Sequence, residues 1–298
     1  MPQAASRRIP KKRVLFLAEA VTLAHVARPV TLARGLERRD LDIHFACHPR
    51  YRSLLGELDL AEHTLDSIEP EQFLEALAAG RPLYDLATLQ RYVEEDLALI
   101  DKVAPDLVVG DFRLSLAVST RVAALPYIAL SNAYWSPYCR QRYPVPDLPM
   151  TRALGPTLGQ GLFSLARPVA FALHCLPMHR LRRRYGLSSL GFNLQEVYTH
   201  ADHTLYADIP EMFDMRRLPD THRFIGPVDW SPDCLRPAWW DEIPRDRPLV
   251  YVTLGSSGQA AALPTVLSAL GGLDVTALVS TAGRPGPAGC PANVHIAP

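Results

Sequence analysis

The sequence predicts an α/β protein whose first domain is built on a parallel β-sheet and whose second domain begins near residue 249. Short apolar runs alternate with helical periodicity between residues 13 and 130, which is typical of a parallel sheet covered on both faces. A proline-rich segment follows over residues 230–248, and another strand, helix and strand come after it. A chain of 298 residues is long enough for two domains.

The composition is that of a chain that folds around a core. Hydrophobic residues make up 48%, and 31 Lys and Arg balance 31 Asp and Glu, so we expect no nucleic-acid partner. The five cysteines are scattered, which predicts reduced thiols rather than disulfides or a thiol-metal site. The first apolar run is too short for a signal peptide or a membrane span, so we expect a cytoplasmic protein without a transmembrane segment.

The first domain is expected over residues 13–229, after a disordered basic tail over residues 1–12. Its first five predicted strands are Val14–Ala18, Asp42–Cys47, His63–Leu65, Leu107–Gly110 and Tyr127–Leu130. Helical periodicity lies between them, as in Val26–Arg39 and Asp85–Val103. In a sheet of order 3-2-1-4-5 the first and fourth strands are neighbours at the point where such sheets bind ligands.

A helical subdomain is expected over residues 148–187, broken at Pro156, Pro168 and Pro177. Its most apolar part, residues 161–178, is interpreted as a buried or interfacial pair of helices because it contains an arginine, a proline and a histidine. A basic run near its end consists of Arg180, Arg182, Arg183 and Arg184. It favours a solvated helix end, with weak contact to a membrane surface as the alternative. Two further strands follow, at His203–Ala207 and His222–Ile225.

Residues 230–248 are expected to form a proline-rich linker, and residues 249–298 the beginning of a second domain. Its predicted elements are strands at Leu249–Leu254, Val275–Ser280 and Asn293–Ile296 and a helix at Ala260–Leu270. So few elements cannot bury both faces of a sheet, so the sequence predicts an incomplete second domain.

Two residues mark a candidate site at the carboxyl ends of the first and fourth strands. The turn after the first strand lacks the glycines of a dinucleotide-binding loop, since the first glycine is Gly35. It places His25 at the start of a helix, where the helix dipole disfavours the imidazolium form. Asp111 ends the fourth strand, so the pair could act as a base and its supporting carboxylate. A capping histidine and an ordinary strand-end aspartate are the alternatives.

Four segments, in this order, resemble the UDP-dependent glycosyltransferases of family 1, including the bacterial macrolide-type enzymes. They are A-H-x-x-x-P at residues 24–29, V-V-G-D-F at 108–112, R-F-I-G-P at 223–227 and V-Y-V-T-L-G-S at 250–256. The resemblance implies the GT-B fold, with two Rossmann-like domains. The first would bind mainly the acceptor and the second mainly the nucleotide sugar.

By this resemblance the protein is an inverting hexosyltransferase that moves a sugar from a UDP-sugar, or another nucleoside diphosphate sugar, to a hydroxyl of a small hydrophobic acceptor. His25 corresponds to the general base and Asp111 to its partner. The scheme needs no metal and no cofactor besides the nucleotide-sugar co-substrate. We predict no metal site from the residues either, because His44 and Cys47 fall on opposite faces of a strand.

The resemblance also implies positions for the two substrates. Gly255, Ser256 and Ser257 correspond to the loop that contacts the donor phosphates at a helix N-terminus. Tyr134 and Trp135 correspond to residues that line the acceptor pocket. An ordinary small-residue turn and simple core packing are the respective alternatives.

The sequence departs from the family pattern in two places. Ala24 stands where many members have glycine before the base, and the glycine-rich donor motif with its histidine is not found in the 298 residues. We therefore expect a C-terminally truncated chain. Two other functions remain open: a non-catalytic acceptor-binding product and a GT-B nucleotide-sugar epimerase.

Overall fold

The computed structural model describes residues 11–145, 149–232, 235–244, 246–255, 260–282, 286–287 and 289–297. It has the predicted α/β fold class, with one large and one small parallel sheet. The chain divides into two compact units between Ser231 and Pro232, inside the segment predicted as a linker.

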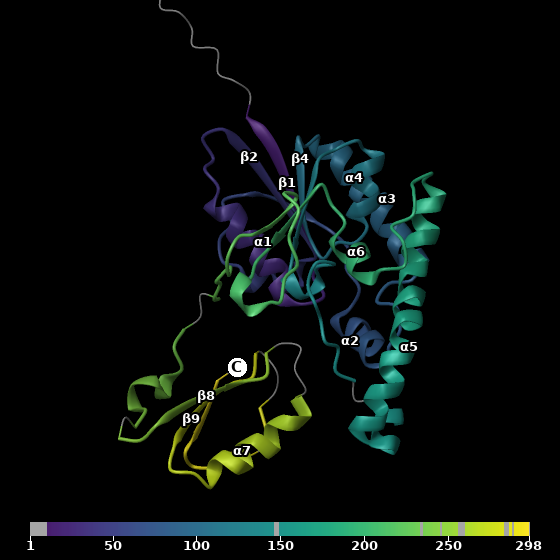
Figure 1. Ribbon diagram of the computed structural model, residues 1–298. Coiled ribbons are helices and arrows are strands. Elements are labelled where there is room, and N and C mark those ends of the chain that lie inside the picture. The colour runs from purple at the N-terminus through teal and green to yellow at the C-terminus, as the bar shows by residue number, and fades with distance from the viewer. Residues whose placement is uncertain are drawn as a thin grey trace, which may run out of the picture. The chain divides into compact units, whose positions relative to one another are not determined.

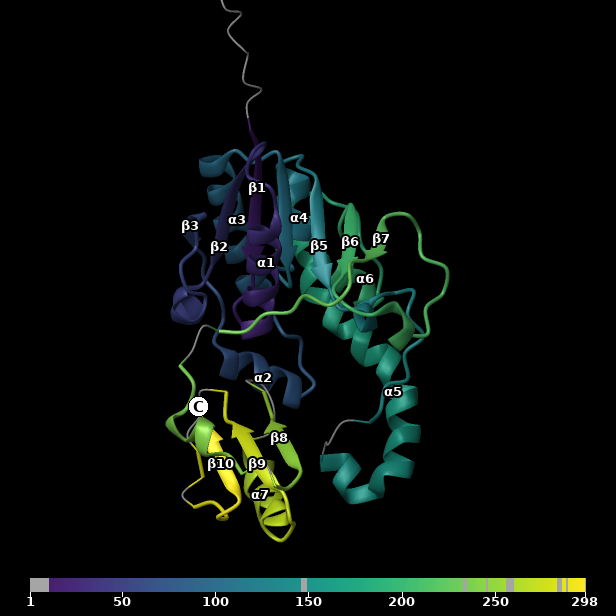
Figure 2. The same cartoon turned by 90° about the vertical axis from the view of Figure 1, so that its left-hand side faces the viewer.

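The first unit is built on a seven-stranded parallel sheet of order β3-β2-β1-β4-β5-β6-β7 (Figure 2). The predicted order of the first five strands is confirmed, and β6 and β7 extend the sheet beyond β5. The strands are β1 (Lys12–Ala18), β2 (Leu41–Cys47), β3 (Ala61–Thr64), β4 (Leu107–Asp111), β5 (Tyr127–Ser131), β6 (His203–Tyr206) and β7 (His222–Phe224).

Helices cover both faces of this sheet (Figures 1 and 2). The α-helices are α1 (Leu23–Gly35), α2 (Pro70–Ala78), α3 (Leu86–Val103), α4 (Leu116–Val122), α5 (Pro149–Arg184) and α6 (Leu194–Thr199). Short 3₁₀ turns are η1 (Pro49–Leu54), η2 (Ala133–Trp135) and η3 (Pro210–Met212). Alternate residues of β1 point to opposite faces: Phe16 packs in the cluster that holds α1, and Leu15 in the cluster that holds the end of α3.

The structure corrects three details of the first unit. Lys12, which we assigned to the tail, begins β1. Pro168 and Pro177 lie inside α5 and do not end it, and the one non-helical residue within its bounds is Gly155, at φ 76° and ψ 165°. The expected pair of buried or interfacial helices is therefore one long helix after a kink, and it is not buried, since only 11% of its most apolar stretch is covered. A proline removes one backbone hydrogen bond, and on an exposed helix water can satisfy the freed carbonyl.

The second unit contains a three-stranded parallel sheet of order β10-β9-β8. Its elements are η4 (Ala238–Glu242), β8 (Leu249–Thr253), η5 (Ala260–Ala262), α7 (Leu263–Gly271), β9 (Thr276–Ser280) and β10 (Val294–Ala297). The core that α7 and the sheet share is small and consists of Leu263, Leu267, Ala277, Val279 and Val294.

Candidate active site

The candidate site lies at the carboxyl ends of β1 and β4, where the structure brings His25 and Asp111 together. Parallel pairing sets Ala18 of β1 beside Asp111 of β4, so the turn after β1 ends next to the aspartate. His25 is the third residue of α1, and its Nδ1 lies 2.8 Å from Oδ1 of Asp111. The ring is 18% exposed, whereas the carboxylate is fully buried. The imidazole therefore has one nitrogen held by a buried carboxylate.

The ionisation of Asp111 decides which ring nitrogen of His25 carries a proton. Burial raises the pKa of this carboxyl, but the charge of Arg28 and the hydrogen bond from His25 outweigh burial, so the pKa lies below its usual value. An ionised carboxylate can only accept hydrogen bonds, so we assign the proton to Nδ1 of His25. Nε2 then carries the free lone pair of the neutral ring.

Arg28 completes this cluster and was missed in the sequence analysis. Its Nε lies 2.7 Å from Oδ2 of Asp111 and its Nη2 lies 2.8 Å from Oδ1, a bidentate pair. Its Nη1 donates to Asn132 at 3.0 Å, and Asn132 donates to Asp208 at 3.3 Å. Two signals could have found these residues: Arg28 is three positions after His25 on one helix, and Asn132 follows the end of β5.

Phe112 holds the His25 ring from one side. Its ring stacks on the imidazole with centroids 4.6 Å apart and an angle of 12° between the planes. The backbone of Phe112 has a φ of 56°, which is rare for a bulky side chain. This strained turn directs Asp111 to Nδ1 of His25 and the next residue onto the face of the same ring.

A buried network of charged side chains holds the strained turn at Phe112 in place. Arg113 has no exposed side-chain surface, and its guanidinium contacts Glu19 at 3.3 Å and Asp96 at 3.0 Å. It also lies 3.7 Å from the centre of the Tyr92 ring. Glu19 directly follows β1, and its backbone N–H donates to the carbonyl of Asp111 at 3.0 Å. The ends of β1 and β4 are therefore tied together both by their backbones and by side chains.

Tyr134 and Trp135 lie in η2 and belong to a row of aromatic rings that reaches the site. Trp135 packs edge-on against Tyr198 at 4.7 Å, and Tyr198 packs edge-on against Phe112 at 5.7 Å. Tyr134 packs against Trp135 at 5.0 Å and is 42% exposed. The structure thus connects both residues to the ring that stacks on His25, and their role toward an acceptor stays a prediction.

Comparisons with known proteins give close relatives. The chain is 51% identical over 296 residues to a PGL/p-HBAD biosynthesis rhamnosyltransferase of Mycobacterium bovis, covering 99% of this chain and 65% of that protein. It is 48% identical over 297 residues to a PGL/p-HBAD biosynthesis glycosyltransferase of Mycobacterium tuberculosis, covering 99% of this chain and 69% of the relative. The chain belongs to the PGL/p-HBAD biosynthesis glycosyltransferases. No protein-family model matches it.

Another member of these glycosyltransferases, from Mycobacterium bovis, is named as inactive. It is 49% identical over 271 residues, covering 91% of this chain and 74% of the relative. The chain spans about two thirds of the length of the curated relatives, 65% in the first case, so about a third of that protein has no counterpart among the 298 residues.

Solved structures confirm the GT-B fold for this member of the PGL/p-HBAD glycosyltransferases. The glycosyltransferase SnogD from Streptomyces nogalater superposes with a TM-score of 0.58 at 20% identity, covering 96% of this chain and 71% of that one. The spinosyn rhamnosyltransferase SpnG gives a TM-score of 0.57 at 16% identity, covering 96% and 70%. The GT-B fold that the sequence motifs implied is thereby confirmed.

The predicted donor loop of this glycosyltransferase is only partly described. Gly255 follows β8 with a φ of 64°, a backbone conformation that favours glycine, and its N–H donates to Oγ1 of Thr253 at 3.1 Å. Ser256 and Ser257 lie outside the described residues. Among the residues that the structure does describe, no group of three or more His, Cys, Asp or Glu side chains is arranged to hold a metal ion.

Proposed function

We propose that this protein is an inverting glycosyltransferase in which His25 is the general base. The observation that carries the proposal is the 2.8 Å contact between Nδ1 of His25 and buried Asp111 at the carboxyl ends of β1 and β4. Such an edge of a parallel sheet is where α/β proteins bind ligands. Membership of a glycosyltransferase family supports the assignment.

The chemistry uses the free nitrogen of the imidazole. Nε2 of His25 accepts the proton of an acceptor hydroxyl while the oxygen attacks the anomeric carbon of the donor sugar. The bond from that carbon to the diphosphate breaks, and the nucleoside diphosphate leaves with the bonding electrons. Asp111 stabilises the imidazolium, and Arg28 fixes the orientation of that carboxylate. The proton then passes from His25 to water.

A dTDP-deoxysugar, with rhamnose as the first candidate, is the donor that the comparisons favour over the UDP-sugar expected from the sequence. Relatives at 51% identity are named rhamnosyltransferases. Two solved glycosyltransferases of the same fold, SsfS6 and SpnG, are described as complexes with thymidine diphosphate. Gly255, Ser256 and Ser257 remain the proposed donor-phosphate loop, and Tyr134 and Trp135 the proposed wall of the acceptor pocket.

The test measures sugar transfer from dTDP-rhamnose by mass spectrometry, with 4-nitrophenol, 1-decanol and water as acceptors. His25→Ala is expected to lower the rate about a hundredfold to ten-thousandfold, which is the usual contribution of a general base. His203→Ala is the matched control because His203 is an exposed histidine of β6. Equal rates for the wild type and His25→Ala would remove His25 from this role.

A binding protein without transferase activity is the second candidate function. It is favoured by the 65% share of the relative's length and by the relative that is named inactive. Calorimetric titration with thymidine diphosphate and with UDP separates the two. If the chain is a transferase, it should bind one of the two nucleotides. If it binds neither nucleotide and releases no sugar from the donor, the second candidate function is the one supported.

A further inference from the structure

A row of apolar side chains on α5 is exposed to solvent. Five residues at spacings of three or four form it: Leu158, Leu162, Leu165, Val169 and Leu173. This set is called the α5 stripe below. Its members are between 46% and 79% exposed, although residues at this spacing share one face of a helix and normally turn inward. The α5 stripe is about 23 Å long at the rise of an α-helix.

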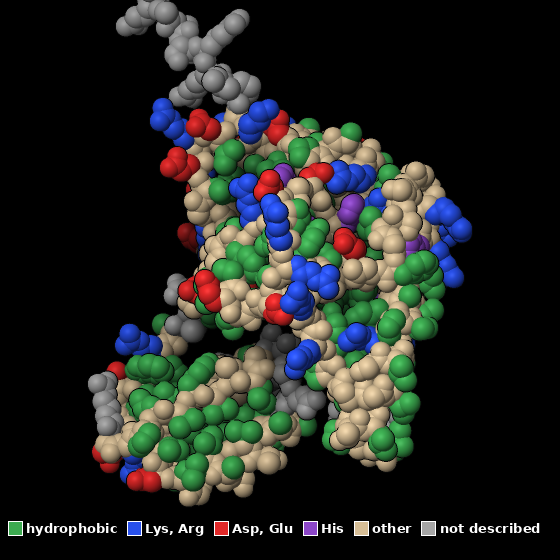
Figure 3. All heavy atoms as spheres, viewed as in Figure 1, with side chains coloured by type: hydrophobic (Ala, Val, Ile, Leu, Met, Phe, Trp, Pro, Cys, Tyr) green, Lys and Arg blue, Asp and Glu red, His purple; other side chains and the backbone are tan. Residues whose placement is uncertain are grey.

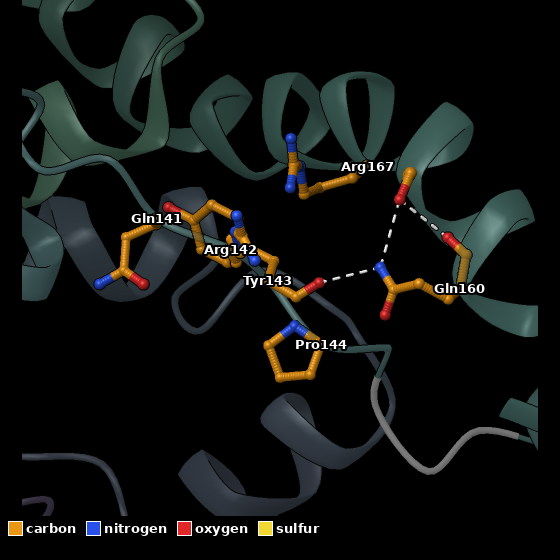
Figure 4. Close-up of a pocket in the computed structure, with 7 residues that line it drawn as sticks. Gln141, Arg142, Tyr143, Pro144, Gln160 and Arg167 are labelled. Carbon is orange, nitrogen blue, oxygen red and sulfur yellow. Dashed lines mark hydrogen bonds between the residues drawn. The ribbon is translucent and has the colours of Figure 1, made fainter. Parts of the chain in front are cut away.

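The opposite face of the same helix faces the protein, and in its earlier turns it carries the polar side chains of Gln160 and Arg167 (Figure 4). Gln160 accepts a hydrogen bond from the backbone N–H of Val145 at 2.8 Å and donates to the carbonyl of Tyr143 at 3.1 Å. The guanidinium of Arg167 lies over the Tyr143 ring, 4.6 Å from its centre. These contacts hold the inner face against Tyr143 and Val145, so the α5 stripe is turned outward by the fold.

The C-terminal turns of α5 pack in the core of the first unit. Cys175, Met178 and Leu181 are almost fully buried in the cluster that also contains Tyr92 and Val93 of α3. By length and composition, residues 151–184 are the one segment of the described chain that could cross a bilayer. Because its last turns pack in this core and its inner face is held by the protein, α5 is suited to lie along a membrane surface instead.

Basic residues continue the face of the α5 stripe. Arg180 follows Leu173 by seven positions, and Arg183 and Arg184 come one turn later; all three are exposed. Arg180 and Arg183 have no hydrogen-bond or ion-pair partner among the described residues, whereas Arg184 donates to Gln90. The 36 residues of α5 contain no Asp or Glu. Figure 3 shows hydrophobic side chains along the outer margin of α5 and Lys or Arg side chains beside them.

We propose that α5 docks this protein on the surface of an anionic phospholipid bilayer. The α5 stripe enters the boundary between headgroups and acyl chains, and Arg180 and Arg183 bind lipid phosphates. An apolar stripe with a cationic end and no acidic residue matches this partner in both polarity and charge. The inference does not depend on transferase activity. Phe112, Trp135 and Tyr198 pack against the same core cluster as the last turns of α5, so docking brings the side of the protein with the aromatic row toward the membrane.

The experiment is co-sedimentation of the whole protein with vesicles, one set of phosphatidylcholine alone and one set with a third of phosphatidylglycerol. Binding to the anionic set is expected, and it should weaken as sodium chloride is raised, because salt screens the arginines. Arg180→Ala and Arg183→Ala should each lower the partition coefficient about fivefold. Leu165→Glu should lower it at least tenfold, because it puts a charge in the middle of the α5 stripe.

Leu77→Glu is the matched control, because Leu77 is a leucine that is 51% exposed on another helix, α2, and is not part of the stripe. Circular dichroism checks that each variant is folded. The proposal is wrong if the wild type binds neither vesicle or if Leu165→Glu binds as well as the wild type. It is also wrong if sedimentation velocity shows a dimer that Leu165→Glu dissociates while vesicles bind nothing, since the α5 stripe would then join two copies of this chain.

Discussion

Asp111 is a buried carboxylate that binds two cationic or protonatable side chains of one helix, His25 and Arg28. We expect Arg28→Met to lower the free energy of unfolding by about 3–5 kcal/mol, because it leaves a buried charge without its bidentate partner. Arg28→Lys should lose part of this amount, since an ammonium cannot reproduce the fork. Urea denaturation measures both. Arg38→Met is the control and should cost less than about 1 kcal/mol, because the Arg38–Asp59 pair is exposed.

The pH dependence of the loss of stability in Arg28→Met tests whether the charge of Asp111 causes that loss. The folded protein holds the pKa of Asp111 below its usual value of 3.8, so the pair contributes stability above that value. This contribution is lost as the pH falls through the lower, folded pKa. The gap between wild type and Arg28→Met should therefore be largest where Asp111 is ionised in both proteins, and it should shrink as acid protonates this carboxyl, first in the variant that lacks the arginine. A gap that is independent of pH down to strong acid would show that Asp111 is not the partner that matters.

At the scale of residues, the sequence could predict the His25–Asp111 pair but not the rest of the cluster. The pair follows from strand ends and strand order, which apolar periodicity reveals. Arg28, Asn132 and Asp208 meet only through the three-dimensional placement of α1, β5 and β6. The positive φ of Phe112 has no sequence signal, because a bulky residue is tolerated there only when the buried Arg113 network fixes the turn.

At the scale of elements, the end of α3 offers a test of local strain. Ala104 caps this helix in the left-handed region, at φ 49° and ψ 60°, and its N–H donates to Ile100 at 2.7 Å. Ala104→Gly should raise the free energy of unfolding by about 1 kcal/mol, because glycine has no Cβ to strain in this conformation. Ala123 caps α4 in the right-handed region, so Ala123→Gly should give no gain. Thermal and urea unfolding of the two variants provide the comparison.

Strands were easier to predict than the long helix. Each predicted strand lies within two residues of an observed one. The clearest are β1, β4 and β5, because buried parallel strands are continuous apolar runs with polar flanks. Pro168 and Pro177 of α5 were misread as breaks because proline ends most helices, whereas the break predicted at Pro156 coincides with the kink at Gly155. The exposure of α5 was missed because periodicity identifies an apolar face without showing what covers it.

At the scale of the whole molecule, two cores of different size share the chain. The first unit has three large clusters of buried residues, and the second has a single small one. The proline-rich segment led us to predict a division there, since prolines are rare inside regular elements. The sequence did not show at which residue of this segment the boundary lies, because η4 forms inside the predicted linker. Side-chain contacts, which the sequence pattern does not contain, decide where one unit ends.

The difference in core size predicts a difference in local stability. On β8, Leu249 is 53% exposed and Tyr251 is 67% exposed, so one face of this strand has little cover in the second unit. Native-state hydrogen exchange should therefore be faster in β8, β9 and β10 than in β1 and β4, by about two orders of magnitude or more. Thymidine diphosphate should slow exchange in the second unit if its first loop binds the donor, because a ligand stabilises the state that binds it. Equal protection in both sheets would instead show that the two units unfold as one cooperative body, and the small core would then owe its stability to the large one.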